Sequence, residues 1–330
     1  MLRDTLKDLL SIYGPTGREN KVADRIEELL AEENIDIRRD AMGNLICERK
    51  GSEEGKVILF SAHMDHIGLI VTDIEKEGYL RVTNVGGIGK DVYTPRHVIF
   101  GNGVEGVVTA QPVKKGDATV ADLFVDIGAA DREDALEMVS PGDICVFAPD
   151  CFEMGPYRIA SPAMDDRCAC ALLLELLLSE KEPVNTIVGV FSTQEEVGMR
   201  GAMTAAYAVD PDLGVGIDVT AWGDTPETRL PAVRLGEGAA VKFMDRSMVA
   251  SPAVRDALIR AAEDSGAAYQ REILPFGGTD GAAIQHARAG IPAGTLSIPC
   301  RYVHSACEVI DMRDMNSALA ILKAFVNMDL

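Results

Sequence analysis

The chain contains three runs of uncharged, mostly apolar residues, and these runs constrain its fold more than any other feature. They lie at residues 57–60, 186–191 and 213–217. A strand that covers one face of a sheet alternates apolar and polar residues, whereas a continuous apolar run suits a strand buried on both faces. The pattern therefore predicts an α/β fold, in which helices cover both sides of a sheet with parallel strands.

Each run leads directly into residue types that bind metals or move protons. His63 and Asp65 follow the first run, Glu195 and Glu196 follow the second, and Asp218 ends the third. Ligands of open α/β sheets gather at the carboxyl ends of the strands, so these side chains are candidates for one site. Two adjacent glutamates could also be surface acids on a solvated loop. At the end of a buried strand, however, they are costly unless something positive balances them.

Two further segments add candidate ligands. Asp165 and Asp166 precede a helix that we expect over residues 166–179. Asp166 suits an N-cap about as well as a functional role, because Asp caps helices and its charge favours that end. Asp165 lies outside the helix and is freer to contact a ligand. His304 follows a strand expected at residues 295–298.

Together these candidates form a ligand set of recognisable chemistry. Two imidazoles and several carboxylates suit zinc, cobalt or manganese, and they do not suit iron–sulfur clusters or copper(I). Two divalent ions would carry four positive charges, which three ligand carboxylates and one hydroxide would balance. Charge balance therefore favours a dinuclear site.

The segment from about residue 71 to residue 161 differs from its flanks. It consists of short β-rich pieces separated by glycine and proline, with one helical pattern at residues 132–139. Short strands at close spacing are typical of a small barrel or sandwich, whereas the flanks alternate helix and strand. We expect a discontinuous α/β domain formed by residues 1–70 and 162–330, with an all-β domain of residues 71–161 inserted into it.

The composition excludes several classes of partner. The formal net charge is −20 and the chain has no basic run, which argues against a nucleic-acid partner. No apolar stretch reaches the roughly 20 residues that cross a bilayer, and the start of the sequence lacks a signal-peptide pattern. We therefore expect a cytoplasmic protein with no membrane partner. The seven scattered cysteines do not form a disulfide framework, and Cys168 and Cys170 are expected in a helix core.

Five segments together resemble a known family. They are SAHMD at 61–65, MDDR at 164–167, TQEEVGMRGA at 193–202, GGTD at 277–280 and RYVHS at 301–305. In these segments the chain is similar to the tetrahedral aminopeptidases, the dinuclear metallo-aminopeptidases of peptidase family 42. That family includes glutamyl and deblocking aminopeptidases, and its members have often been labelled endoglucanases or cellulases. The resemblance covers essentially the whole chain and implies a mixed-sheet metallopeptidase domain of the phosphorylase/hydrolase-like type with an inserted β-barrel.

The resemblance also implies a role for each candidate residue. His63 and Asp218 would bind one metal ion, Glu196 and His304 the other, and Asp165 would bridge them. Glu195 would be the general base that takes a proton from a metal-bridging water and passes it to the leaving amine. Asp65 would orient His63.

Further expectations concern the substrate and the assembly. Gly277, Gly278 and Asp280 would shape the substrate pocket. His66 stands where the family commonly has glutamate, and we expect it to have a supporting or solvent-facing role and not to bind metal. By analogy, the chain would act on peptides and form a homo-oligomer, a dodecamer whose dimer contacts lie on the inserted barrel.

Two other functions are weighed against this one. Glycoside hydrolysis is suggested by the carboxylates and by the family's older labels, but it has no use for paired histidines. A non-catalytic metal-binding or scaffold protein would share the ligands and lack turnover.

Overall fold

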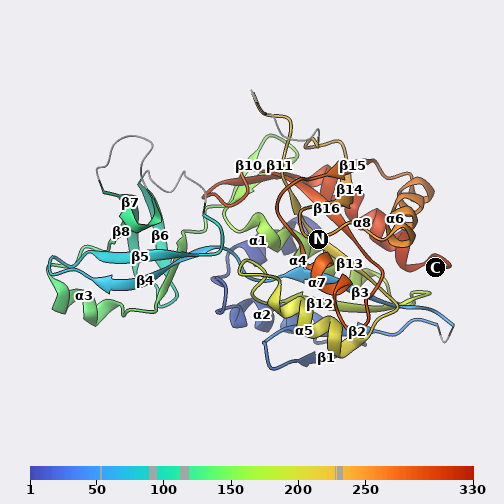
Figure 1. Ribbon diagram of the computed structural model, residues 1–330, viewed down its shortest axis with the longest axis horizontal. Coiled ribbons are helices and arrows are strands. Elements are labelled where there is room, and N and C mark those ends of the chain that lie inside the picture. Colours follow the sequence, from blue (N-terminus) through green and yellow to red (C-terminus); the bar gives the residue numbers. More distant parts are fainter. Residues whose placement is uncertain (53, 89–94, 112–118, 227, 229–232) are drawn as a thin grey trace.

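The computed structural model describes the chain except residues 53, 89–94, 112–118, 227 and 229–232. Figure 1 shows two parts, a large α/β part and a barrel that projects from one end of it. The expected fold class, a mixed-sheet α/β domain with a small all-β barrel, is confirmed.

The α/β part is built on an 11-stranded sheet. Its central strands β12, β3, β13 and β16 are parallel, and the pairs outside them are antiparallel except for the parallel pair of β14 and β15. The main path, in order across the sheet, is β1 (Asp36–Arg39), β2 (Leu45–Arg49), β12 (Thr186–Ser192), β3 (Val57–His63), β13 (Leu213–Thr220), β16 (Ala293–Arg301), β17 (Glu308–Asp311), β11 (Arg158–Ser161) and β10 (Phe152–Met154). Off this path, β14 (Ala239–Met244) pairs with β16 and with β15 (Tyr269–Ile273).

Helices cover both faces of this sheet, which explains why its central strands are apolar throughout. One face packs on α1 (Leu2–Leu10), α2 (Asn20–Leu30), α4 (Met164–Ser179), α6 (Pro252–Ser265) and α8 (Met312–Val326). The other face packs on α5 (Arg200–Val209) and α7 (Asp280–Gln285). Helix α7 approaches β13 very closely, because a Cβ built on Gly216 would lie 2.8 Å from the Gly281 nitrogen. Glycine at this position lets the start of α7 reach the strand that carries Asp218.

The barrel is closed by six antiparallel strands with a hydrophobic core of their own. In order around the barrel they are β4 (Gly68–Ile74), β5 (Leu80–Val85), β8 (Leu123–Asp126), β7 (Glu105–Ala110), β6 (Arg96–Phe100) and β9 (Ile144–Phe147). Helix α3 (Arg132–Met138) lies beside them, and a short 3₁₀ turn spans Val120–Asp122. The expected domain limits, 71 and 161, stay a prediction. The barrel strands themselves run from Gly68 to Phe147, and β10 and β11 pair within the large sheet.

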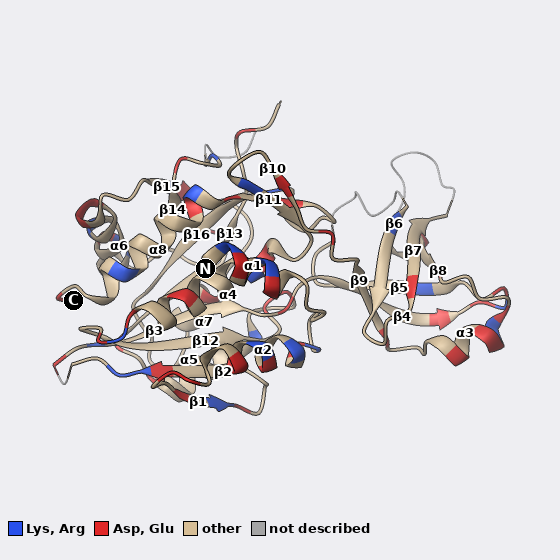
Figure 2. Cartoon of the chain, turned by 180° about the vertical axis from the view of Figure 1, so that it is seen from behind, with Lys and Arg blue, Asp and Glu red and all other residues tan. Residues whose placement is uncertain are grey.

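Charged residues lie mainly on the outer elements. Figure 2 shows them on α1, α2, α3 and β1, whereas the central strands are largely free of them. Among the described residues, no helix combines the length and the apolar character that crossing a membrane would require.

Candidate metal centre

The candidate ligands meet at one edge of the large sheet because the strands that carry them are parallel. His63 is the last residue of β3, and Ser192, directly opposite it, ends β12 just before Glu195 and Glu196. Asp218 lies near the end of β13, the other parallel neighbour of β3. Asp165 comes from the first turn of α4, and His304 from the connection between β16 and β17. Chain direction and register thus bring together side chains far apart in sequence.

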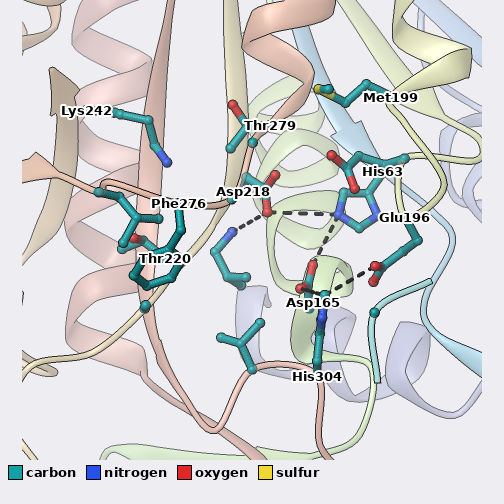
Figure 3. Close-up of a pocket in the computed structure, with 18 of the residues that line it drawn as sticks. His63, Asp165, Glu196, Met199, Asp218, Thr220, Lys242, Phe276, Thr279 and His304 are labelled. Atoms are coloured by element: carbon teal, nitrogen blue, oxygen red, sulfur yellow. Dashed lines mark hydrogen bonds and ion pairs between the residues drawn. The ribbon is translucent and has the colours of Figure 1, made fainter. Parts of the chain in front are cut away.

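These residues form two groups of possible metal ligands that share Asp165. One contains His63, Asp165 and Asp218, and the other contains Asp165, Glu196 and His304. In the first, His63 Nε2 lies 3.1 Å from Asp165 Oδ1 and 3.9 Å from Asp218 Oδ1. In the second, His304 Nε2 lies 3.3 Å from Asp165 Oδ2 and 3.2 Å from Glu196 Oε2. Figure 3 shows the five side chains converging on Asp165, whose two oxygens face different histidines.

The protonation of His63 shows that this cluster requires positive charge. His63 Nδ1 lies 2.9 Å from the carbonyl oxygen of Asp65, which can only accept, so Nδ1 carries a proton. A neutral ring then presents a lone pair from Nε2 to Asp165 Oδ1. This carboxylate oxygen and Glu196 Oε1 are buried without a hydrogen-bond partner among the described residues. A cation, or a second proton on the ring, is needed to hold these groups together, and their donor chemistry suits a divalent metal ion.

The pKa shifts in the cluster also indicate that it favours positive charge. Burial lowers the pKa of His63, but its contacts with Asp165 and Asp65 outweigh burial and raise that pKa well above its ordinary value. The same balance, with Asp165 and Glu196 as partners, raises the pKa of His304 to about 12. Burial raises the pKa of Asp165, but the two histidines lower it by more. The carboxylates therefore stabilise positive charge at both histidines.

Glu195 lies beside the two groups and belongs to neither of them. Its side chain lines the same pocket as the ligands. Burial raises the pKa of its carboxyl well above its ordinary value; the charge of His63 opposes this rise, and the charges of Asp218, Asp280 and Glu196 add to it. A carboxylate in such surroundings is a strong proton acceptor.

Asp65 contacts His63 in a different way from the one expected. The Asp65 backbone carbonyl accepts the His63 ring N–H, and the carboxylate Oδ1 is farther away, at 3.6 Å from Nδ1. The carboxylate instead accepts the hydroxyl of Thr16 at 2.8 Å and the backbone N–H groups of Glu195 at 2.9 Å and Glu196 at 3.3 Å. Asp65 therefore holds the histidine through its backbone and the two glutamates through its side chain.

A pocket of about 580 Å³ opens over the ligands. Gly277 and Gly278 line it, as expected for residues that shape a substrate pocket. Asp280 is not among the lining residues, because its carboxylate is buried and accepts the hydroxyls of Ser61 at 2.7 Å and Ser192 at 2.5 Å. The remaining wall is mostly apolar, with a lysine on the side away from His63, as Figure 3 shows. These wall residues include Val219, Trp222, Leu274, Phe276, Val303 and Lys242.

The barrel also reaches the pocket. Gly86 and Gly87 directly follow β5, and Gly87 lines the pocket beside His304. A Cβ built on Gly87 would lie 2.9 Å from His304 Nδ1. Only a residue without a side chain fits between the barrel and this candidate ligand.

Sequence reasoning missed two buried carboxylates near the site. Glu308 on β17 accepts the backbone N–H of Asp165 at 3.0 Å and that of His304 at 2.6 Å, so one side chain holds two candidate ligands. Glu272 on β15 lies 2.9 Å from the ammonium of Lys242, and both side chains are fully buried. Both strands carry a second charged residue, Asp311 in β17 and Arg271 in β15, so no apolar run marked these positions in the sequence.

His66 is buried, so the solvent-facing position that we considered for it does not occur. Its Nδ1 donates to the Ile67 carbonyl at 3.0 Å. Burial, and then the nearby Arg167 guanidinium, lower the pKa of His66 to about 3. It therefore stays neutral, and it belongs to neither ligand group.

Comparisons with known proteins agree over nearly the whole chain. The profile of the M42 glutamyl aminopeptidase family matches residues 43–321. A protein of Acetivibrio thermocellus, provisionally named an aminopeptidase, is 40% identical over 97% of this chain and 96% of its own length.

Solved structures are equally similar. An aminopeptidase from the archaeon Desulfurococcus kamchatkensis matches with a TM-score of 0.95 and 35% identity, over 99% of this chain and 95% of that one. The TET1 peptidase of Pyrococcus horikoshii matches with a TM-score of 0.89 and 32% identity, over 99% of both chains. That peptidase is described as able to assemble into a tetrahedron or a large octahedral shell.

Proposed function

This chain belongs to the M42 glutamyl aminopeptidase family, and from that premise we propose that it removes N-terminal residues from peptides at a centre of two divalent metal ions, with Glu195 as general base. Membership makes the chain an aminopeptidase, a hydrolase that acts on peptides. The number of ions, the ligands and the base go beyond membership, and the contacts within the pocket support each of them.

One observation carries the proposal: the two oxygens of a single buried carboxylate, Asp165, face two separate ligand groups. Asp165 would bridge the two ions, with His63 and Asp218 on one side and Glu196 and His304 on the other. The unpartnered oxygens of Asp165 and Glu196 support this assignment, because buried carboxylate oxygens are rarely left without a donor or a cation. Zinc, cobalt and manganese all suit two imidazoles and three carboxylates.

Bound divalent cations would supply Lewis-acid chemistry, polarising the scissile carbonyl and activating the attacking water. Glu195 accepts the proton of that water and donates it to the leaving amine as the peptide bond breaks. Asp65 keeps Glu195 in place by accepting its backbone N–H, and the carbonyl of Asp65 fixes the ring of His63. The N-terminal side chain of the peptide lies in the pocket, where Gly277 and Gly278 leave room for it.

No contact in the site favours glycoside hydrolysis. That chemistry requires two carboxyl groups facing each other across roughly 5–10 Å and assigns no role to imidazoles. His63 and His304 are instead in direct contact with Asp165.

Substitutions of the neighbouring residues Glu195 and Glu196 distinguish the proposed general base from the proposed metal ligand. Glu195→Gln should leave about two metal ions per chain, measured by plasma mass spectrometry, and should lower kcat on an aminoacyl chromogenic substrate by roughly 10²–10⁴-fold. Glu196→Gln, the same chemical change one residue later, should lower the metal content as well. Full activity in Glu195→Gln would show that Glu195 is not the base, and activity that survives EDTA would remove the metallopeptidase mechanism. Two bound ions without turnover in the unchanged chain would support the scaffold alternative.

We also propose a homo-oligomer with peptide substrates, by analogy with the tetrahedron-forming TET1 peptidase. The barrel, which projects from the α/β part, would supply the dimer contacts of a dodecamer. Sedimentation velocity of the intact chain tests this, since a monomer would contradict it.

A further inference from the structure

The segment that carries Glu195 and Glu196 is held by side chains and not by a regular element. Residues 193–196 follow β12 and belong to no helix or strand. Asn44 Oδ1 accepts the backbone N–H of Thr193 at 2.9 Å, and Glu19 Oε1 accepts that of Gln194 at 3.2 Å. The Asp65 carboxylate accepts the backbone N–H groups of Glu195 and Glu196. Four consecutive N–H groups are thus bound by three side chains.

The backbone of this segment needs such support. Gln194 has a φ of 57°, a left-handed conformation that non-glycine residues adopt only when their surroundings enforce it. The carbonyls are also paired, because Thr193, Gln194 and Glu195 accept the N–H groups that lead into α5. The N–H groups of residues 193–196 and the carbonyls of residues 193–195 are therefore all paired in one particular conformation.

Two of the three supporting residues have no other place in the catalytic site. Glu19 and Asn44 line no part of the pocket and belong to neither ligand group. Both are buried and held rigidly themselves: Glu19 Oε1 also accepts the N–H of Gly17 at 2.7 Å, and Asn44 Nδ2 donates to Asp40 at 2.6 Å and to the Gly201 carbonyl at 3.0 Å. They are thus fixed acceptors in the N-terminal fifth of the chain.

We propose that Glu19 and Asn44 are positioning residues, which place the Glu195 carboxylate by holding the backbone of Thr193 and Gln194; this inference rests on the proposed function. Loss of the Glu19 acceptor leaves the Gln194 N–H unpaired and lets its backbone leave the left-handed conformation. Glu195 is the next residue, so its carboxylate moves with that change. The pocket walls come mainly from other segments, so substrate binding should change little.

The central test compares two substitutions of Glu19. Glu19→Ala removes the acceptor and should lower kcat by roughly 10–100-fold, as is typical for residues that orient catalytic groups, with KM changed less than about twofold. Glu19→Gln keeps an oxygen of the same reach and should retain kcat within about threefold. Metal content by plasma mass spectrometry should stay near two ions per chain in both. Asn44→Ala should show the same split between kcat and KM.

A matched control removes an equivalent acceptor elsewhere. Asp314 is buried on α8 and accepts the backbone N–H groups of Gly236 and Gly238, each at 2.7 Å. Asp314→Ala should lower Tm as Glu19→Ala does and should leave kcat within about twofold. If Glu19→Ala fails to fold, Glu19→Asp, which shortens the reach by one methylene and keeps the charge, should show the loss of kcat.

Several results would overturn the inference. One is an unchanged kcat in a folded Glu19→Ala or Glu19→Asp chain. Another is an equal loss in Glu19→Gln, because the charge and not the acceptor would then matter. A rise in KM with unchanged kcat would place Glu19 in substrate binding. An active Glu195→Gln chain would instead contradict the proposed base, so the two failures are distinguishable.

Discussion

The α/β part and the barrel differ in how they contribute to the site. The parallel strands of the α/β part end at one edge, where they or the segments that follow them present four of the five candidate ligands, and α4 adds Asp165. The antiparallel barrel closes on itself around its own core, and among its described residues Gly86 and Gly87 approach that edge. Parallel strands thus concentrate the residues that follow them at one end, whereas neighbouring strands of this antiparallel barrel end on opposite sides, and the barrel contributes shape.

The largest expected effect lies at the point where the two ligand groups meet. Asp165→Ala removes a ligand from both groups and should lower kcat/KM by at least about 10³-fold, with loss of most of the bound metal. Asp126→Asn, on an exposed position of barrel strand β8, should keep both activity and metal. Equal losses in the two variants would remove the functional distinction between the two parts.

A buried ion pair in the α/β part should contribute more to stability than an exposed pair in the barrel. Glu272→Gln leaves the Lys242 ammonium without its closest carboxylate, and we expect the free energy of unfolding to fall by about 3 kcal/mol. Denaturant unfolding measures this. A change below about 1 kcal/mol would show that Asp245, 3.4 Å from the same ammonium, suffices as partner.

The contact between the barrel and the metal site can be tested by adding a methyl group at Gly87, where the barrel approaches His304. Gly87→Ala places a methyl group against His304 and should lower kcat by roughly tenfold while weakening metal binding. Gly106→Ala creates similar crowding inside the barrel, where a Cβ would lie 2.8 Å from the Asp126 carbonyl oxygen. It should lower Tm and leave kcat unchanged. Normal metal binding in Gly87→Ala would show that the barrel merely lies near the site.

The smallest effect is expected for an exposed ion pair of the barrel. Arg132 lies 3.1 Å from Asp73, and both side chains are exposed. Asp73→Asn should shift Tm by no more than about 1 °C, because solvent screens such pairs. A larger shift that persists in high salt would show that the barrel surface also depends on specific pairing.

The sequence predicted the sheet and the five candidate ligands because both follow from local patterns. A buried strand reads as a continuous apolar run, and His63 or Asp218 marks where such a run ends. The two strands that carry Lys242 and Glu272 were not predicted, because Lys242 interrupts a short apolar segment and Glu272 lies in a largely polar one. Such a charge can be buried only with a partner, and the partner lies in a different strand.

The supporting contacts were harder still to predict. The spacing of His63 and Asp65 suggested that the Asp65 carboxylate orients the His63 ring. Its oxygens instead accept the backbone N–H groups of Glu195 and Glu196, about 130 residues away in the sequence. A contact between residues so far apart in the sequence cannot be predicted from a local sequence pattern. The same holds for Glu308, which binds two candidate ligands through backbone groups that every residue has.

The spread of the ligands along the chain also sets an order of assembly. A growing chain emerges from the ribosome with its N-terminal residues first. The residues of the group of His63, Asp165 and Asp218 have therefore all been made once residue 218 is added, whereas His304, and Glu308 that holds Asp165, come with the last strands of the sheet. All residues of one candidate ligand group are therefore present in a nascent chain well before the second group has its last member.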